Sequence, residues 1–426
     1  MIIHVVQVGD TIKSISEKYR IPIITLIQEN GLTNPNNLVP GQSIIIINPK
    51  VSYTAQKGDT LVNIANKYGV SIMELLRNNP HLSNRDLYPG EIVIIQFDTQ
   101  KVREIEISGF AYPHINRDIL KKTLPFLTYL TVFNYQVTGA GNIIEVDDME
   151  LIQLAKQYGV APMMLISTLS PSGIGSRETA LNIVSNISLQ DTHIDKIISI
   201  LKKKGYYGIN AYLQHLDNDN RVIYEKYISR FAYRMHQEGY LINITVNPKI
   251  LYERTSVTYE KIDYSNLAKV VDSVLILSYE WGYSYEPPAS ATPINILEQM
   301  LSNITTIIQP SKLLLGIPII GYDWKLPYIP GETKANAITH EAAIDLAVIQ
   351  SVTIQYDETA EAPYYFYTSN DKQLHIVWFK DSRSINTLLK LILEFNLEGG
   401  SVWNVMYFFT QLWYLVNTQF EIKKLL

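Results

Sequence analysis

Residues 204–214, KGYYGINAYLQ, are the stretch on which the interpretation of the whole chain depends. Their apolar run predicts a short buried strand. Alternate residues of a strand point to the same side, so Asn210, Tyr212 and Gln214 are expected to present their side chains together at its carboxyl end. In a barrel of parallel strands, the chemistry takes place at that end. The stretch therefore brings uncharged polar groups, and no carboxylate, to the point where a barrel enzyme would act.

The composition limits the class of protein. A chain of 426 residues can hold one large core and smaller modules, since single cores stop growing at roughly 250–300 residues. The formal net charge of −5 argues against a nucleic-acid partner. No stretch of about 18 apolar residues occurs, so no membrane span is predicted. The first residues, MIIHVVQVGDT, lack the basic and apolar regions of a secretory signal peptide.

The residue types exclude several kinds of chemistry. The chain has no cysteine, which rules out disulfide bonds, thiol catalysis and thiolate metal ligands. The eight histidines show no ligand spacing such as HExxH, so we expect no metal. No nucleotide-binding glycine motif is present, so we expect no cofactor. The 29 tyrosines against 11 phenylalanines suit sugar stacking, because a tyrosine ring joins an apolar face to a polar tip.

The first part of the chain contains an internal repeat. HVVQVGDTIKSISEKYRIPIITLIQENGL (4–32) recurs as SYTAQKGDTLVNIANKYGVSIMELLRNNPHL (52–82), and Gly9 and Gly58 mark equivalent positions. Each copy predicts the order strand, helix, helix, strand, with the Asp-Thr pair at the start of the first helix. A Pro-Gly turn precedes each closing strand.

This repeat resembles the LysM module, through its GDT start, Asn-rich middle and PGQ-type turn. The resemblance implies a βααβ fold that binds glycans containing N-acetylglucosamine, such as peptidoglycan or chitin. It implies a shallow groove between Gly9–Ile12 and Glu29–Leu32 in the first copy, and between Gly58–Leu61 and Asn78–His81 in the second. The alternative is that GDT is only a helix cap and the repeat a scaffold. The candidate glycan-binding residues are Gly9, Asp10, Thr11, Asn30, Gly58, Asp59, Thr60 and Asn79.

The remainder of the chain alternates apolar runs with amphipathic segments, which predicts an α/β fold, a (β/α)₈ TIM barrel. The candidate strands cover residues 104–112, 127–135, 161–167, 206–214, 241–248, 273–281, 312–320 and 399–406. The gap between the last two strands is too long for one helix, and VTIQYDE, PYYFYTS and LHIVWFK predict a small inserted α+β unit there. The expected division is 1–49 and 50–97 for the two repeat modules, 98–104 for a linker, and 105–426 for the barrel with an insertion at about 322–380.

Several motifs make this barrel resemble glycoside hydrolase family 18, in the spore-cortex-lytic branch that carries two LysM modules. They are LSYEWGYSYEPP (277–288), GYDWKLP (321–327), VWFKDSRS (377–384) and GGSVWNV (399–405). The resemblance implies that Tyr279 steadies the acetamido oxygen of the substrate and that Trp403 forms the floor of a sugar subsite. It also implies sugar contacts by Glu280 and Asp323 at the rim of the barrel. Trp281 and Tyr283 could stack on sugars at the rim or pack under the insertion.

The family's chemistry rests on a fourth-strand signature, Asp-x-x-Asp-x-Asp-x-Glu. The resemblance implies that the Glu protonates the glycosidic oxygen and that the Asp before it orients the substrate's own acetamido group. This chain has Tyr207, Asn210, Tyr212 and Gln214 at the four positions, all expected to face the barrel mouth. A glutamine has no proton to release, and losing a general acid costs about 10²–10⁴-fold in rate.

Other acids were considered for the missing role. Asp217 and Asp219 follow the strand and are expected on a solvated polar loop. Glu280 is the best candidate for a substitute acid, although it is expected beside the reacting sugar rather than under the leaving oxygen.

Three functions remain open from the sequence. The first is a pseudoenzyme of the spore or cell envelope that binds peptidoglycan or another N-acetylglucosamine glycan. The second is an active N-acetylglucosaminidase that acts on spore cortex fragments. The third is a structural or assembly protein of the spore envelope, with other envelope proteins as partners. Localisation to the spore envelope or cell wall follows from both resemblances, with deposition from the mother cell expected.

Overall fold

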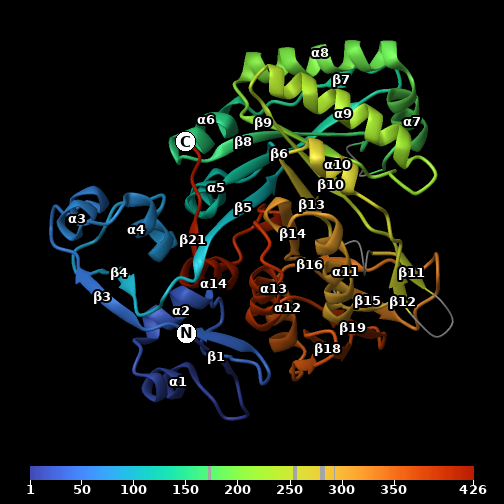
Figure 1. The fold of residues 1–426 in the computed structure, drawn as a ribbon. Coiled ribbons are helices and arrows are strands. Elements are labelled where there is room, and N and C mark those ends of the chain that lie inside the picture. The colour runs from blue at the N-terminus through green and yellow to red at the C-terminus, as the bar shows by residue number, and fades with distance from the viewer. Residues whose placement is uncertain (171–173, 253–256, 279–283, 292) are drawn as a thin grey trace.

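The computed structural model describes residues 1–426 except 171–173, 253–256, 279–283 and 292 (Figure 1). The described chain forms two small N-terminal modules, a barrel, and a sheet inserted into the barrel. Among the described residues, none of the helices has the length and apolar character needed to cross a membrane.

The two N-terminal modules share the order strand, helix, helix, strand. Module 1 (residues 2–46) contains β1 (Ile2–Val5), α1 (Ile12–Tyr19), α2 (Ile23–Asn30) and β2 (Ser43–Ile46). Module 2 (residues 49–97) contains β3 (Pro49–Thr54), α3 (Leu61–Tyr68), α4 (Ile72–Asn78), the short 3-10 helix η1 (Pro80–Leu82) and β4 (Ile92–Phe97). In each module the two strands pair antiparallel, and each module has a small apolar core of its own.

Eight parallel strands close into a barrel, as the apolar runs predicted. They are β5 (Arg103–Ala111), β6 (Tyr129–Val137), β8 (Ala161–Ser167), β9 (Gly208–Tyr212), β10 (Leu241–Val246), β13 (Ser273–Ile276), β14 (Leu313–Pro318) and β20 (Gly399–Trp403). The barrel is closed because β5 pairs with both β6 and β20. The strands are almost entirely buried, because side chains fill the inside and helices cover the outside.

The elements around the barrel follow the strands in turn. The helices are α5 (Arg117–Thr123), η2 (Leu124–Phe126), α6 (Met149–Gln157), α7 (Arg177–Ser185), α8 (Ile187–Lys204), α9 (Arg221–Gln237), α10 (Ser265–Val270), α11 (Ile294–Ile307), η3 (Pro310–Lys312), α13 (Ser382–Glu394) and α14 (Thr410–Gln419). Short extra strands are β7 (Ile143–Ile144), β11 (Ile250–Tyr252) and β12 (Val257–Tyr259). Figure 1 shows α8 and α9 on the outside of the barrel, away from the two modules.

The insertion between β14 and β20 is a five-stranded sheet with one helix. It contains β15 (Gly321–Leu326), β16 (Asn336–Ile338), α12 (His340–Ile349), β17 (Gln355–Asp357), β18 (Ala362–Thr368) and β19 (Leu374–Trp378). The strands lie in the order β16-β15-β19-β18-β17, and all neighbours are antiparallel. Between α12 and the sheet lies a separate apolar cluster that includes Ile344, Tyr365 and Val377.

The end of the chain closes the amino end of the barrel. Strand β21 (Phe420–Ile422) pairs with Arg103–Ile105, so the last two residues of the expected linker belong to β5. Lys423 donates to the carboxylates of Glu106 (2.9 Å) and Glu398 (3.1 Å). The tail therefore fixes the side of the barrel opposite to its mouth.

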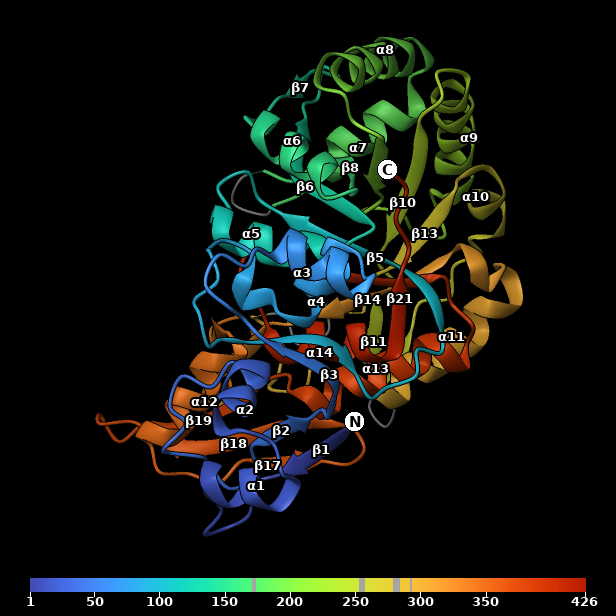
Figure 2. The ribbon, with the colours of Figure 1, turned by 90° about the vertical axis from the view of Figure 1, so that its left-hand side faces the viewer.

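Helix α14 carries both modules on the side of the barrel (Figure 2). Gln411 Nε2 donates to Asn30 Oδ1 (3.0 Å) and to the Ser43 carbonyl (2.9 Å) in module 1. Asn417 Nδ2 donates to Asn78 Oδ1 (2.8 Å) in module 2. These side chains are buried, so each module is held by paired polar groups within the contact and not by a surface ion pair.

Candidate functional site

Asn210 lies inside the barrel on β9 and is only 4% exposed. Its Oδ1 accepts a hydrogen bond from the Thr245 hydroxyl on the neighbouring strand β10 (2.7 Å). The two strands run parallel with these residues close in register, which brings the side chains together. Asn210 therefore has a polar partner within the barrel wall.

Tyr212 and Trp403 end their strands at the carboxyl end of the barrel and share one apolar cluster. Both are partly exposed, as expected for side chains that line a mouth. The Trp403 ring lies 5.0 Å from the Phe133 ring and 5.4 Å from the Phe110 ring, measured between centroids. Aromatic rings in such edge and tilted contacts stabilise one another and hold the indole in place. The mouth is therefore floored by aromatic side chains.

Gln214 lies two residues beyond the end of β9, beneath the backbone that enters α7. A Cβ atom added to Gly175 would stand 2.1 Å from Gln214 Oε1 and 2.9 Å from His215 Nε2. Both of these atoms are buried and have no hydrogen-bond partner among the described residues. With a larger residue at position 175, the side-chain ends of Gln214 and His215 would have to move. The amide at the position of the family's acid is thus covered by Gly175.

Tyr207 does not face the mouth, contrary to the expectation from the signature. It packs with Tyr129 and Ala161, which start their strands, with Met163, and with Leu425 of the C-terminal tail. It lies before the first residue of β9 and three residues from Asn210, an odd spacing that does not keep two side chains on one face of a strand. The structure thus brings Asn210, Tyr212 and Gln214 towards the carboxyl end and leaves Tyr207 at the other.

Asp217 is buried, which differs from the solvated position expected for it. Its Oδ2 lies 2.7 Å from Arg177 Nη1, and its Oδ1 accepts from the backbone N–H of Asp219 (3.1 Å) and Asn220 (3.0 Å). Burial raises the pKa of this carboxyl, but Arg177 and the Asn220 N–H outweigh it and hold the pKa below its usual value. Asp217 is therefore an ionised group that orders the loop before α9. Asp219 is exposed, as expected.

Asp323 lies in the inserted sheet and is 9% exposed. Its Oδ2 accepts from the Tyr367 hydroxyl (2.8 Å), and its Oδ1 lies 2.9 Å from His375 Nδ1. Burial, followed by the hydrogen bond to Asp323, raises the pKa of Tyr367. Tyr367 and His375 thus occupy both carboxylate oxygens of Asp323 within the insertion. A sugar contact by Asp323 stays a prediction, and it would compete with these two partners.

The four residues expected after the sixth barrel strand cannot be placed. Tyr279, Glu280, Trp281 and Tyr283 lie outside the described residues. Their roles stay predictions from the sequence.

The Gly-Asp-Thr segments of both modules form equivalent turns. Gly9 and Gly58 have φ values of +92° and +91°, a region that glycine adopts without strain. Asp10 Oδ2 accepts a hydrogen bond from the Gln7 N–H (2.8 Å), and Asp59 Oδ2 accepts the equivalent bond from the Gln56 N–H (2.7 Å). These backbone hydrogen bonds are the first cause of the lowered pKa of both carboxyls.

Each of the two Asp residues also meets a side chain from the first strand of its module. Asp10 Oδ2 lies 3.0 Å from His4 Nε2, and Asp59 Oδ2 accepts from the Tyr53 hydroxyl (2.8 Å). Thr11 and Thr60 cap the helices that follow, by accepting a backbone N–H on their hydroxyls. The motif thus has a structural role in both copies, whatever it binds.

Asn30 and Asn79 join the second helix of each module to its closing strand. Asn30 donates to the Ile45 carbonyl (2.9 Å) and accepts from the Ile45 N–H (2.7 Å). Asn79 makes the same pair with Ile94, at 2.7 Å and 2.8 Å. Both asparagines are almost fully buried. Their contribution to glycan binding stays a prediction, because the structure shows only a role in the fold.

The second loops of the two expected grooves, Glu29–Leu32 and Asn78–His81, begin where the modules contact helix α14. In module 1, Glu29 is 2% exposed, and neither of its carboxylate oxygens has a hydrogen-bond partner among the described residues. Burial therefore raises the pKa of the Glu29 carboxyl well above its usual value. In module 2, burial lowers the pKa of His81 to about 4, so the imidazole is neutral.

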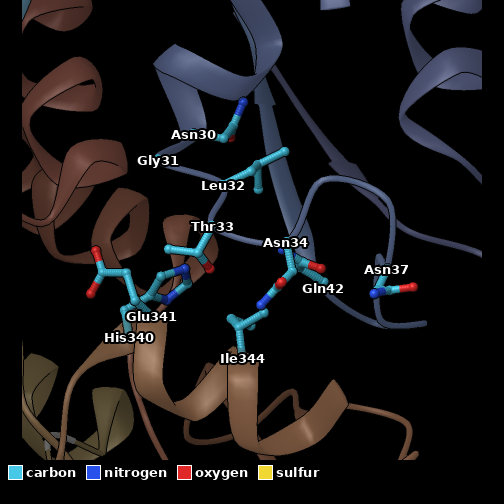
Figure 3. Close-up of a pocket in the computed structure, with 10 residues that line it drawn as sticks. All are labelled: Asn30, Gly31, Leu32, Thr33, Asn34, Asn37, Gln42, His340, Glu341 and Ile344. Carbon is cyan, nitrogen blue, oxygen red and sulfur yellow. The ribbon is translucent and has the colours of Figure 1, made fainter. Parts of the chain in front are cut away.

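A small cavity separates module 1 from the insertion (Figure 3). Residues from the loop between α2 and β2 line one side, and His340, Glu341 and Ile344 of α12 line the other. Its volume is about 20 Å³, which is room for about one water molecule. On the open side, the Thr33 hydroxyl (3.0 Å) and Asn34 Nδ2 (2.7 Å) both donate to Asp345 Oδ1.

The part of the chain that the structure describes contains no group of three or more histidine or acidic side chains placed to hold a metal ion.

Comparison with known proteins identifies the class to which this fold belongs. The model of glycosyl hydrolases family 18 matches residues 173–407, and the LysM domain matches residues 4–46 and 53–96. The chain belongs to glycosyl hydrolases family 18 and carries two LysM domains ahead of the barrel.

Particular relatives resemble the whole chain. It is 36% identical to the cortical fragment-lytic enzyme of Bacillus subtilis (strain 168), over 100% of this chain and 99% of that protein. It is 27% identical to the putative sporulation-specific glycosylase YdhD of the same organism, over 100% of both. The crystal structure of the spore cortex-lytic enzyme SleL of Bacillus megaterium QM B1551 matches with a TM-score of 0.81 and 31% identity, over 100% of this chain and 99% of that one.

Some residues of the site were not found from the sequence. Gly175 and Thr245 lie next to Gln214 and Asn210, but neither stands in a motif. The aromatic neighbours of Trp403 lie on strands that were predicted only as apolar runs. A single sequence holds no signal for these contacts, because they depend on which strands are neighbours in the barrel.

Proposed function

We propose that this protein binds peptidoglycan or another glycan containing N-acetylglucosamine at the spore envelope or cell wall, and that its barrel is a pseudoenzyme. The observation that carries the proposal is Gln214, which stands where the family signature has its acid and lies beneath Gly175. A carboxamide cannot protonate a leaving oxygen, and the covering backbone leaves little space beside it.

The neighbouring positions support the same conclusion. Tyr212 replaces the carboxylate that would orient the acetamido group, and its ring belongs to the aromatic cluster at the mouth. Asn210 is engaged with Thr245. What remains at the carboxyl end is an aromatic floor with amide groups, and such a surface suits sugar binding more than bond cleavage.

The relatives support the location and the kind of ligand. Two LysM domains and a likeness across the full chain to cortical fragment-lytic enzymes favour a glycan of the spore or cell wall as the partner. The same relatives favour a second candidate, an active N-acetylglucosaminidase in which another acid acts. Glu280 is the residue to test for that role.

The deciding experiment measures binding and turnover on one sample. The full-length protein is incubated with purified cortex peptidoglycan, and pelleted protein and new reducing ends are both measured, with the cortical fragment-lytic enzyme of Bacillus subtilis as the reference. We expect pelleting without new reducing ends. Turnover that Glu280→Ala abolishes would overturn the pseudoenzyme and establish the second candidate. Absence of pelleting would overturn the glycan-binding function and favour the assembly role.

A further inference from the structure

The two modules are equivalent in sequence and fold, but their surroundings differ. Val39 and Tyr88 occupy the same position in the turn that precedes the closing strand. Val39 is 3% exposed and belongs to the apolar cluster of the insertion, with Ile344 and Ile354. Tyr88 is 67% exposed. The turn of module 1 is thus part of the core of another unit, and the turn of module 2 faces solvent.

The glycines of these turns show the same contrast. Gly41 and Gly90 have almost the same φ, +88° and +90°. A Cβ at Gly41 would stand 1.9 Å from the Ile354 carbonyl oxygen, whereas a Cβ at Gly90 would meet no atom within 4 Å. The carbonyls of Pro40 and Gly41 also accept hydrogen bonds, one from the insertion and one from α13 of the barrel. Ile354 N–H donates to the Pro40 carbonyl (2.9 Å), and Arg383 Nη2 donates to the Gly41 carbonyl (3.0 Å).

The second groove loop of module 1 is covered as well. Thr33 and Asn34 are held by Asp345, and the space between this loop and α12 is about 20 Å³ (Figure 3). Sites for small ligands occupy roughly 300–1,000 Å³, so a sugar ring does not fit between them. The corresponding loop of module 2 makes its hydrogen bonds within the module, through Ser83 to Pro80 and through Arg85 to Glu91, and Asn84 is exposed.

Module 2 touches the barrel at the end of α4 and at η1, which lies against α5. Arg77 donates to Asn417 Oδ1 (3.3 Å) and to the Pro125 carbonyl (3.3 Å), and Asn78 pairs with Asn417. Figure 1 shows α3 on the side of the module away from the barrel, so its first groove loop, which leads into α3, is left open. Gly58 in this loop has no heavy atom within 4 Å of its Cβ position, and neither has Gly9, so the two modules differ at the second loop and the turn rather than at the first loop.

We infer that the two modules have different tasks: module 2 binds the glycan, and module 1 is a structural unit fixed against the insertion and the barrel. This inference rests on the proposed glycan-binding function and names the module that performs it. The exposed Tyr88 ring, with the Arg85 guanidinium 5.4 Å from its centroid, offers a flat face next to the open loops. Tyrosine faces of this kind bind sugar rings by stacking.

The repeat supplies matched variants for the test, which uses the full-length protein. Tyr88→Ala is expected to weaken pelleting with cortex peptidoglycan by about fivefold or more, the factor that corresponds to about 1 kcal/mol, and to leave the melting temperature unchanged. Val39→Ala is expected to lower the melting temperature by about 3–6 °C, because it opens a space in a shared core, and to leave binding unchanged.

A second pair tests the first groove loops. Gly9→Ala and Gly58→Ala introduce the same backbone strain, since both glycines have φ near +90° and free space around them. We expect weaker pelleting only for Gly58→Ala. If Gly9→Ala weakens pelleting as much as Gly58→Ala does, or if Val39→Ala and Tyr88→Ala act alike, the division of tasks is wrong. If the unchanged protein does not pellet, the glycan-binding function itself is wrong, and this inference with it.

Discussion

Gly175 lies directly above Gln214, with 2.1 Å between the place of a Cβ and the side-chain oxygen. The contact joins the segment after the third barrel strand to the segment after the fourth. It fixes the amide at the position where the family signature has its acid. Gly175 and Gln214 carry no ionisable group, so neither of them can supply a proton near neutral pH.

Restoring the missing acids should restore little hydrolysis. In the double variant Gln214→Glu, Tyr212→Asp, the new carboxyl at 214 would lie beneath Gly175, and the aspartate would replace an aromatic ring of the mouth. Tyr207 and Asn210 would still differ from the signature. We expect no release of reducing ends from chitooligosaccharides above that of the unchanged protein. Turnover within about tenfold of the Bacillus subtilis enzyme would contradict this prediction.

Substitution of Gly175 should destabilise the protein. In Gly175→Ala the methyl group would overlap the side-chain ends of Gln214 and His215, so these two buried side-chain ends must move. We expect a loss of about 1–3 kcal/mol in the free energy of unfolding, measured with denaturant. Gly139→Ala is the control, because the nearest atom to its Cβ would be 3.7 Å away. Equal effects of the two substitutions would show that the close contact at Gly175 does not matter.

Glu29 should make the stability fall as the pH rises. Burial raises its pKa above that of the unfolded chain, so the folded state favours the protonated form. Its favourable contribution is complete below the unfolded pKa of about 4.3 and is lost as the pH rises through the raised folded value. Glu29→Gln should therefore stabilise the protein by about 1–3 kcal/mol at pH 8 and change little at pH 4.

The measurement for Glu29 is denaturant unfolding at both pH values. Glu17→Gln serves as the control, since the Glu17 side chain is 68% exposed on the same module. A variant at Glu29 that is less stable than the unchanged protein at pH 8 would mean that the carboxylate has a favourable partner.

Asp323 should matter more for the stability of the insertion than for glycan binding. Asp323→Ala leaves the Tyr367 hydroxyl and His375 without their shared acceptor in a buried place. Removing one member of such a group costs about 2–4 kcal/mol. We expect a clear loss in unfolding free energy with unchanged pelleting on peptidoglycan. Weaker pelleting without loss of stability would instead assign Asp323 to the sugar site, as the family resemblance implied.

The barrel and the two modules could be predicted because their signals are local. Each barrel strand is an apolar run of the expected length, and the repeat makes each module visible twice. The signature spacing predicts that Tyr207 faces the barrel mouth together with the other three positions. That prediction is wrong, because Tyr207 and Asn210 are three residues apart and so lie on opposite faces of the strand. The polar stretch after the strand predicts Asp217 in solvent, and no local pattern points to its partner Arg177, which lies 40 residues earlier in the chain.

The attachment of the modules could not be predicted at all. It depends on contacts such as Gly41 with Ile354 and Asn78 with Asn417, which join residues several hundred positions apart. Val39 and Tyr88 look interchangeable in the repeat, and only the surface that each one meets separates them. The pattern of apolar residues predicts which side chains are buried within their own module. It does not predict which surface residues a second unit covers.

Helix α14 is the support for both modules, and it is the last helix of the chain. During synthesis the modules therefore leave the ribosome long before their support exists, by roughly 15–75 s at about 5–20 residues per second. Each has its own small apolar core and can fold during that time. Throughout this interval the buried faces of Glu29 and Arg77 are exposed to water, where both side chains are readily hydrated. The contact surfaces of the two modules therefore carry ionisable groups that water can hydrate until α14 is made.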